Sequence, residues 1–214
     1  MGGVSEPPFD TLNLGRLTED DPEQVAENRR RLCAEAGTDP ELLKYGRQAH
    51  GPLVRRAEGQ GEPGDGVWSD TQGEPLLVFT ADCLPVALAR ANGERPAIAA
   101  LHVGWRGLLG GIVQIAATAL GGGRLGAAIG PGIGPCCYEV RDDVAGPFRE
   151  QFGAAIAHGG RLDLWSATEQ ALRAAGAATV SRVDLCTACN PELFFSHRRD
   201  AGRTGRQGLI AYVA

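Results

Sequence analysis

Apolar runs along the chain predict strands and helices that follow one another closely. Residues 76–89 and 97–103 form two apolar runs with turn residues at 91–96 between them, a pattern typical of a strand pair. From Gly107 onward the apolar positions recur with the helical period, as far as the glycines at 121–123. The central part of the chain is therefore predicted to run strand, turn, strand, helix.

The flanking segments continue this alternation. A helix is expected at 21–32, where Pro22 and acidic residues stand near the start and arginines toward the end. A short strand is expected at 53–57, followed by a loop rich in Gly and Pro at 58–66. In the second half we expect two strands, at 125–130 and 180–185, and two helices, at 141–152 and 166–175.

The order of these elements predicts the fold class. Ser166 with Glu169 three residues later has the pattern of a capping box, so the last helix is expected to begin at Ser166. Interleaved strands and helices predict an α/β or α+β layered fold, with mixed β-sheets and flanking helices. No internal repeat or linker divides the sequence, so residues 1–214 are expected to form a single domain.

Composition narrows the class of protein. With 43% hydrophobic and 22% charged residues the chain resembles a soluble globular protein, and its longest apolar run is shorter than a membrane span. The first residues, MGGVSEPPFD, lack the basic and apolar parts of a secretory signal, which predicts a cytoplasmic location. A net charge of -5 argues against general binding to nucleic acid.

An acid, a thiol and a proline interrupt the apolar run 76–89. Asp82 within a buried strand is costly unless it is paired, and Pro85 removes a backbone donor from the sheet. We therefore expect the strand to bend or bulge here and to turn Cys83 outward.

Cys83 is one of three candidate metal ligands. His50 and His102 each stand near a glycine at the end of a predicted strand, where side chains can point into a cleft. Two imidazoles and one thiolate leave a fourth position for water or substrate, as in a catalytic zinc site. A buried thiol with hydrogen-bonded histidines is the alternative, and Asp82 is a candidate carboxylate behind a metal-bound imidazole.

Other residues suggest further sites. Residues 198–206 hold four arginines, which favours either a solvated loop or a site for phosphate or carboxylate, with His197 beside it. His158 is expected to be structural, at a helix end. The glycines and prolines of 130–135 indicate a tight loop that lines a pocket rather than a dinucleotide-binding loop.

Six cysteines in a cytosolic chain are expected to be free thiols or metal ligands. The pair Cys186 and Cys189 could join Cys136 and Cys137 in a four-thiolate zinc site, but neighbouring side chains of an extended segment point to opposite sides, which disfavours it. A zinc site of the cytidine deaminase type is excluded, because the chain has no His-x-Glu sequence.

Eight segments, in order along nearly the whole chain, resemble the YfiH/YlmD family. They are LNLG (12–15), NRRRL (28–32), QAHG (48–51), TADCLPV (80–86), HVGWRG (102–107), IGPGIGPCCYEV (129–140), LCT (185–187) and FFSHRRDAGRTGR (194–206). These proteins have been labelled polyphenol oxidases or laccase-domain proteins and are better described as purine nucleoside phosphorylases. Family members have a strand and a Thr-Arg step ahead of GGVS, which here follows Met1, so the start is expected to be misassigned or to lack that arginine.

The resemblance implies a fold similar to the catalytic domain of cytotoxic necrotizing factor, and one zinc ion held by His50, Cys83 and His102. It implies phosphorolysis of adenosine, inosine, guanosine and methylthioadenosine, adenosine deamination, and a role in peptidoglycan editing. Cys83, His102 and Asp82 are then the expected catalytic residues. The expected substrate-binding residues are Asn13, Arg106, Arg198 and Arg199, with purine nucleosides and phosphate as partners of a monomer or homodimer.

Three alternatives compete with this interpretation. A multicopper laccase needs more imidazoles than the four histidines here, and a single copper with two His and one Cys lacks its usual axial ligand, because the only methionine is Met1. A metal-free hydrolase would use Cys83 as nucleophile and His102 as base. A protein that edits or binds cell-wall precursors would yield no ribose 1-phosphate from nucleosides and phosphate.

Overall fold

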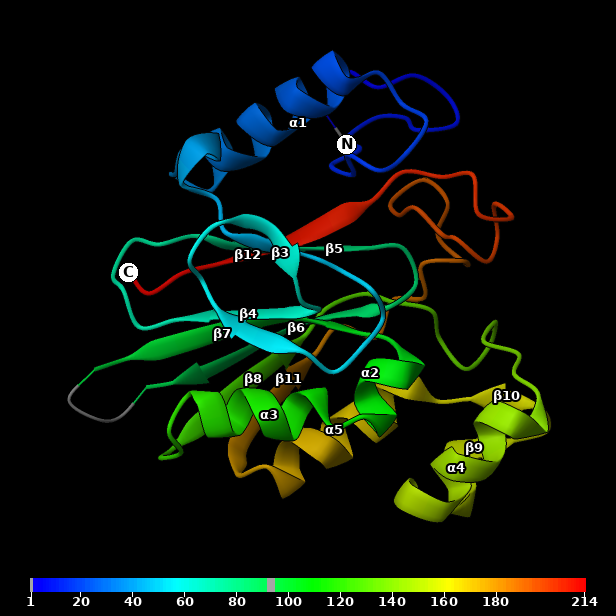
Figure 1. Cartoon of the computed structure of the whole chain (residues 1–214). Helices are drawn as coiled ribbons and strands as arrows, with labels where there is room; N and C mark the ends of the chain where they lie inside the picture. The colour runs from blue at the N-terminus through cyan, green and yellow to red at the C-terminus, as the bar shows by residue number, and fades with distance from the viewer. Residues whose placement is uncertain (1, 92–94) are drawn as a thin grey trace.

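A six-stranded mixed sheet lies at the centre of the computed structural model, which describes residues 2–91 and 95–214 (Figure 1). Its strands, in the order β11-β8-β6-β7-β4-β2, are β2 (Val54–Arg56), β4 (Gly66–Ser69), β6 (Leu84–Arg90), β7 (Ala97–Val103), β8 (Leu125–Ile129) and β11 (Ala177–Arg182). Strands β6 and β7 pair antiparallel, as predicted. The turn predicted at 91–96 includes residues 92–94, which lie outside the described residues.

Two smaller sheets lie against one face of the central sheet. Strand β5 (Leu76–Thr80) pairs antiparallel with β12 (Gln207–Ala211), and β1 (Tyr45–Arg47) pairs parallel with β3 (Gln60–Pro63). Buried side chains of Leu76, Val78, Val67 and Ala100 fill the space between the β5–β12 sheet and the central sheet. The segment 58–66 was predicted as a loop, but it contains strand β3.

Helices cover the two outer faces of the layers. The helix predicted at 21–32 is observed as α1 (Pro22–Glu35); it begins after its cap Asp21 and packs Cys33 against Leu43 and Leu77 on the β5–β12 sheet. The other face of the central sheet carries α2 (Trp105–Leu109), α3 (Ile112–Ala119), α4 (Asp142–Phe152) and α5 (Leu164–Ala174), which Figure 1 shows below the sheet. The layered α/β expectation is confirmed.

Short elements complete the chain, and two predictions about helix ends are corrected. They are two 3-10 turns, Pro40–Leu42 and Ala154–Ile156, and the hairpin of β9 (Ala157–His158) and β10 (Arg161–Leu162). His158 lies exposed in this hairpin rather than at a helix end, because Gly153, with φ 94°, ends α4. The helix predicted from Gly107 begins at Trp105 and is divided at Gly111, whose φ is 82°.

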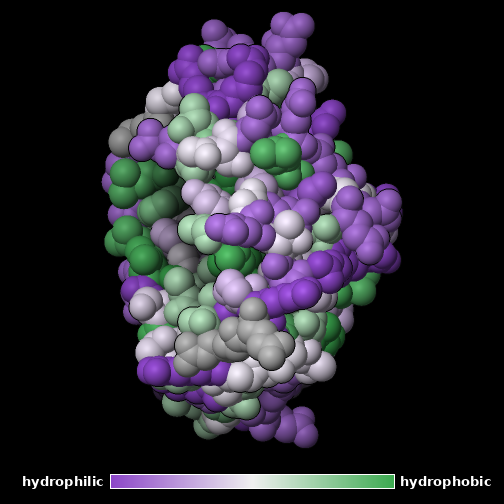
Figure 2. Space-filling model, turned by 90° about the vertical axis from the view of Figure 1, so that its left-hand side faces the viewer, coloured by the Kyte–Doolittle hydropathy of each residue, from purple (hydrophilic) through white to green (hydrophobic). Residues whose placement is uncertain are grey.

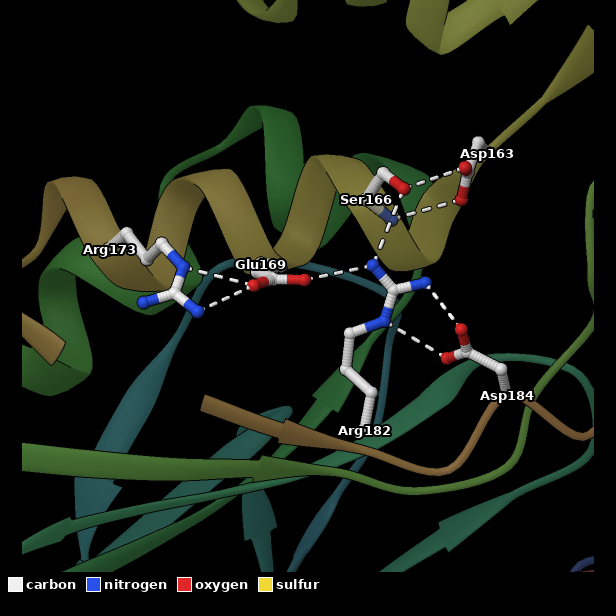
Figure 3. Close-up of polar contacts among 6 residues, drawn as sticks. All are labelled: Asp163, Ser166, Glu169, Arg173, Arg182 and Asp184. Carbon is white, nitrogen blue, oxygen red and sulfur yellow. Dashed lines mark hydrogen bonds and ion pairs between the residues drawn. The ribbon is translucent and has the colours of Figure 1, made fainter. Parts of the chain in front are cut away.

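The start of α5 also differs from the prediction. Its N-cap is Asp163, whose carboxylate accepts hydrogen bonds from the backbone N–H and the hydroxyl of Ser166 (Figure 3). Glu169 does not turn back to the cap but pairs with Arg173 and with Arg182. The helix starts earlier because an Asp three residues before a Ser is an equally good cap, and it buries Leu164 in the core.

Hydrophobic side chains on the surface are scattered. The face seen in Figure 2 shows hydrophilic residues interspersed with separate groups of hydrophobic ones. Large exposed hydrophobic side chains come from distant parts of the fold, for example Leu17, Ile115 and Leu193. Among the described residues, no helix has the length and apolar character needed to cross a bilayer.

Candidate metal centre and cleft

His50, Cys83 and His102 meet at one point, with their ligand atoms all within 4.8 Å of one another. His50 follows β1, Cys83 lies between β5 and β6, and His102 belongs to β7. The antiparallel register places Pro85 opposite His102, so Cys83 reaches the same end of β7. The two imidazole rings are 4.9 Å apart and nearly perpendicular. Residues remote in sequence thus form a compact set of three donors.

The predicted bend before Pro85 is a transfer between two sheets. Strand β5 ends at Thr80 and pairs with β12, whereas β6 starts at Leu84 in the central sheet. Asp82 in the connection has φ 86°, and His50 has φ 61°, a region that side chains other than glycine rarely adopt. Strained backbone of this kind is concentrated at functional sites, and here it carries one ligand and the neighbour of another.

Asp65 holds both histidine-bearing segments. Its Oδ1 accepts hydrogen bonds from His102 Nδ1 and from the His50 backbone N–H, both at 2.8 Å. Its Oδ2 accepts from the N–H groups of Ala49 and Gly51, both at 2.9 Å. Because Nδ1 of His102 faces this carboxylate, Nε2 is the nitrogen left to face Cys83 and any metal ion. Asp65, and not the predicted Asp82, is therefore the carboxylate behind His102, and no sequence signal pointed to it.

Charge coupling at the centre changes the protonation of the donors. Burial opposes ionisation of Cys83, but the charge of His102 and hydrogen bonds from both histidines outweigh it and lower the pKa of the thiol to about 6. Against the effect of burial, the Cys83 charge and the Asp65 hydrogen bond raise the pKa of His102 to about 9. Cys83 is therefore a thiolate near neutral pH, which is the form that binds metal or attacks as a nucleophile.

Asp82 connects the strand transfer to the C-terminal half of the chain. Its Oδ1 accepts hydrogen bonds from the hydroxyls of Thr187 at 2.6 Å and Ser196 at 2.7 Å, and its Oδ2 accepts from the Arg198 N–H at 2.6 Å. These three donors satisfy a buried carboxylate that the sequence analysis could not pair. Asp82 also lines the cleft, and its catalytic role stays a prediction.

A cleft of about 820 Å³ lies above the three donors. Its lining combines positive charge with aromatic rings. The arginines are Arg16, Arg29, Arg47, Arg198 and Arg206, and the aromatic residues are Tyr45, Phe79 and Tyr138. Burial first, and then the Cys83 charge, raises the pKa of Tyr138, so its phenol remains a hydrogen-bond donor. The cleft suits a ligand that has both an anionic group and a flat ring.

The predicted substrate-binding residues fall in different places. Arg198 lines the cleft with its guanidinium 5.4 Å from the Tyr138 ring centroid, and His197 lines it as well. Arg106 is exposed, lies over Trp105 and is not among the residues that line the cleft, although its charge acts on the lining residue Tyr138 and opposes the rise in pKa that burial causes there. Only part of the predicted set therefore lines the cleft.

The other two predicted substrate-binding residues support the framework. Arg199 donates to the carbonyls of Thr187 and Phe194. Asn13 is fully buried. Its side-chain NH₂ group donates hydrogen bonds to Thr18 and Asp20, and its side-chain oxygen accepts one from the backbone N–H of Arg206. Asn13 thus positions Arg206, a cleft residue that the sequence analysis counted only as part of an arginine-rich segment.

The structure also brings together the four cysteines of the disfavoured second site. The sulfurs of Cys136, Cys137, Cys186 and Cys189 all lie within 4.8 Å of one another. The premise against the site was wrong, because residues 135–137 form a turn and not an extended segment. In a turn, consecutive side chains can point to the same side.

The whole chain, residues 1–214, matches the model of a family described as multi-copper polyphenol oxidoreductase laccase. The purine nucleoside phosphorylase YfiH of Escherichia coli K12 is 38% identical over 224 residues, which cover 100% of this chain and 90% of the relative. The purine nucleoside phosphorylase YlmD of Geobacillus stearothermophilus is 35% identical, with 99% and 86% covered. The resemblance inferred from the eight segments is confirmed.

Solved structures give the same result for the fold. The hypothetical protein YfiH of Bacillus licheniformis superposes with a TM-score of 0.92 at 30% identity, and the match covers 100% of this chain and 90% of that one. YlmD from Geobacillus stearothermophilus superposes with a TM-score of 0.88 at 32% identity, covering 100% and 89%. The layers described above are therefore those of these relatives.

Proposed function

This chain belongs to the family described as multi-copper polyphenol oxidoreductase laccase, and from that membership and its cleft we propose that it is a zinc-dependent purine nucleoside phosphorylase that also deaminates adenosine. One observation carries the proposal: three metal donors form the floor of a cleft lined by arginines and aromatic rings. Adenosine, inosine, guanosine and methylthioadenosine are the proposed substrates. A cytoplasmic monomer or homodimer is the proposed form.

The donor set supports zinc. Two imidazoles and one thiolate leave a fourth position, and His50 is exposed toward the solvent side of the centre. Asp65 orients His102, as carboxylates do behind zinc-bound histidines. When bound here, zinc supplies a Lewis acid that polarises a substrate group or activates water. A multicopper centre would need further imidazoles, and the sequence holds only four histidines.

The cleft lining supports phosphorolysis. An oxygen of phosphate forms a bond to ribose C1′ while the bond from C1′ to the purine breaks, and the purine leaves with the electron pair and takes up a proton. Arg198 and Arg206 are the proposed phosphate ligands, because guanidinium groups bind phosphate through paired hydrogen bonds. Tyr45, Phe79 and Tyr138 are the proposed contacts of the purine and ribose rings.

Deamination uses the same cleft with water in place of phosphate. A water oxygen attacks purine C6, and the amino group leaves as ammonia. Asp82 lies on the cleft surface beside Cys83 and is the proposed carrier of the proton from water to the leaving group. Since phosphate and water act at different carbons, the two reactions yield different products.

Product analysis tests the proposal. Purified protein is incubated with adenosine, with and without phosphate, and the products are separated by chromatography. We expect adenine and ribose 1-phosphate only with phosphate, and inosine in both cases. Cys83→Ala should lose both activities and the zinc ion of the cleft, whereas Cys33→Ala, at a buried cysteine in α1 that does not line the cleft, should keep them. Absence of all three products with the wild-type protein would refute the function.

A second candidate is a metal-free cysteine hydrolase. The thiolate of Cys83 and the protonated imidazole of His102 favour it, because their coupled pKa values match a nucleophile and its acid partner. Metal analysis separates the two candidates. Activity that survives removal of zinc, and that ends when Cys83 is alkylated, would favour the hydrolase, including one acting on a cell-wall precursor.

A further inference from the structure

Four cysteines gather in two turns, one of which directly precedes the cleft residue Tyr138. Cys136 and Cys137 lie in the turn 135–137, Cys186 directly precedes the turn 187–189, and Cys189 is the last residue of that turn. The Cys189 sulfur is 3.3 Å from that of Cys137 and 3.6 Å from that of Cys136. All four sulfurs lie within 4.8 Å of one another, although Cys137 and Cys186 are 49 positions apart in the sequence.

The spacing of the sulfurs discriminates between a metal site and a disulfide. A tetrahedral zinc site with bonds of about 2.3 Å places its sulfurs roughly 3.8 Å apart. A disulfide needs about 2.05 Å. Distances of 3.3 and 3.6 Å are near the tetrahedral edge, and a fourth sulfur within 4.8 Å completes the set. To form two disulfides, the four sulfurs would have to move apart into two separate pairs.

Backbone contacts prepare the two turns for a shared ion. The N–H of Gly134 donates to the Cys186 sulfur at 3.2 Å, a contact that stabilises a thiolate ligand. Asn190 donates its side-chain amide to the Cys186 carbonyl at 2.7 Å. A Cβ at Gly134 would stand 2.7 Å from Trp165, so glycine is required for this close approach. The Cys186 to Cys189 spacing is that of a zinc-binding Cys-x-x-Cys pair.

Further contacts hold the segment that leads to Cys186. Gly132 and Cys186 form a parallel bridge, and the Thr187 N–H donates to the Gly132 carbonyl at 3.1 Å. Arg182 at the end of β11 pairs with Glu169 of α5 and with Asp184, as Figure 3 shows. The turn that carries two of the cysteines is therefore placed by neighbours that do not depend on the sulfurs.

We propose that Cys136, Cys137, Cys186 and Cys189 bind a second zinc ion in a closed structural site, separate from the centre at His50, Cys83 and His102. Four protein ligands leave no position for substrate, so this ion has no direct part in the reaction. Its effect is to join two borders of the cleft. Tyr138 follows Cys137, and Thr187 between the other two ligands bonds Asp82 beside Cys83.

Metal stoichiometry tests the proposal without reference to activity. The full-length protein is purified under reducing conditions, dialysed against a weak chelator and analysed for zinc per chain. We expect two zinc ions in the wild-type protein and one in Cys189→Ser. Cys83→Ala should also hold one ion, because it loses only the cleft site, and Cys33→Ala should hold two. If the cleft does not bind zinc at all, Cys83→Ala and the wild type will match, and loss in Cys189→Ser alone still supports this site.

Cobalt substitution identifies the ligands of the four-cysteine site. In Cys83→Ala reconstituted with Co²⁺, four thiolates should give intense sulfur-to-metal charge-transfer bands and tetrahedral d–d bands. X-ray absorption of the zinc form of that variant should show sulfur neighbours only, at about 2.3 Å. A zinc content that is equal in the wild type and Cys189→Ser would overturn the proposal. So would a disulfide between Cys189 and Cys136 or Cys137, found by mass spectrometry of the protein as purified.

Discussion

Replacing Asp65 by asparagine would perturb the proposed metal centre without changing a proposed ligand. The carboxylate is 2% exposed and accepts four hydrogen bonds, two on each oxygen. In Asp65→Asn one oxygen becomes an NH₂ group, which faces two N–H donors and can accept from neither. With the NH₂ group in place of Oδ2 the variant loses two of the four bonds; in place of Oδ1 it loses the bond from the His50 N–H and can bond His102 only if the ring proton moves to Nε2, the nitrogen left for a metal ion.

The magnitude follows from this count. A hydrogen bond to a charged group is worth about 1.5 to 3 kcal/mol, so losing two destabilises the fold by about 3 to 6 kcal/mol before the loop at His50 relaxes. Removing the carboxylate behind a metal-bound histidine lowers metal affinity by about 10- to 100-fold. We expect both effects, since Asp65 holds the His50 segment as well as the His102 ring.

Two measurements check these values. Urea unfolding of the zinc-free protein gives the change in the free energy of unfolding, and competition with a chromogenic chelator gives the zinc affinity. Asp70→Asn is the matched control, because Asp70 follows the same strand, β4, and pairs with Arg56 at the surface, where ion pairs contribute about 0 to 1 kcal/mol. An Asp65→Asn protein that equals this control in both measurements would refute the reasoning.

Three further substitutions or treatments follow from the site. Gly104→Ala would place a Cβ 3.0 Å from the Cys83 sulfur and 3.7 Å from His50, and overpacking of this kind costs about 1 to 3 kcal/mol. Zinc affinity should therefore fall by about 10-fold while the circular dichroism spectrum stays unchanged. An unchanged zinc affinity would contradict this prediction. In the zinc-free protein the pKa of Cys83 is lowered to about 6, so its alkylation by iodoacetamide should be fast at neutral pH and slow as the pH falls through 6, and a midpoint near 9 would be the opposite result. Arg198→Ala should raise KM for phosphate by about 10-fold in steady-state kinetics, whereas the exposed Arg141→Ala should not, and equal KM values would remove Arg198 from the phosphate site.

Local signals in the sequence predicted most elements of the fold. Asp21, Pro22 and the following acids predict α1, because an N-cap acts within its own first turn. The cap of α5 was placed three residues late, since Asp163 and Ser166 both carry suitable side chains and burial of Leu164 decides between them. The two sheets joined at residues 81–83 could not be predicted, because a strand pattern does not say which strand lies beside it.

The site was predictable only where residue type alone carries the chemistry. Residue type made His50, Cys83 and His102 candidate ligands, and the resemblance of their segments to the family selected them over a buried thiol with hydrogen-bonded histidines; the structure brings the three together. Asp65 was missed because its partners are brought to it by the pairing of β4 with β7, which is a tertiary contact. The hydrogen-bond partners of Asp82 could not be predicted either, because the hydroxyls of Thr187 and Ser196 that donate to it lie more than 100 residues further along the chain.

The origin of the three cleft ligands in separate sheets has a consequence for metal exchange. His50 follows the β1–β3 sheet, Cys83 leaves the β5–β12 sheet, and His102 lies in the central sheet. An ion bound by all three is a cross-link between layers, so a local opening of one sheet also breaks a metal bond. Amide hydrogens in all three sheets should then become protected together on loading. Dissociation of the ion would follow the rate of a collective opening rather than the lifetime of a single ligand bond.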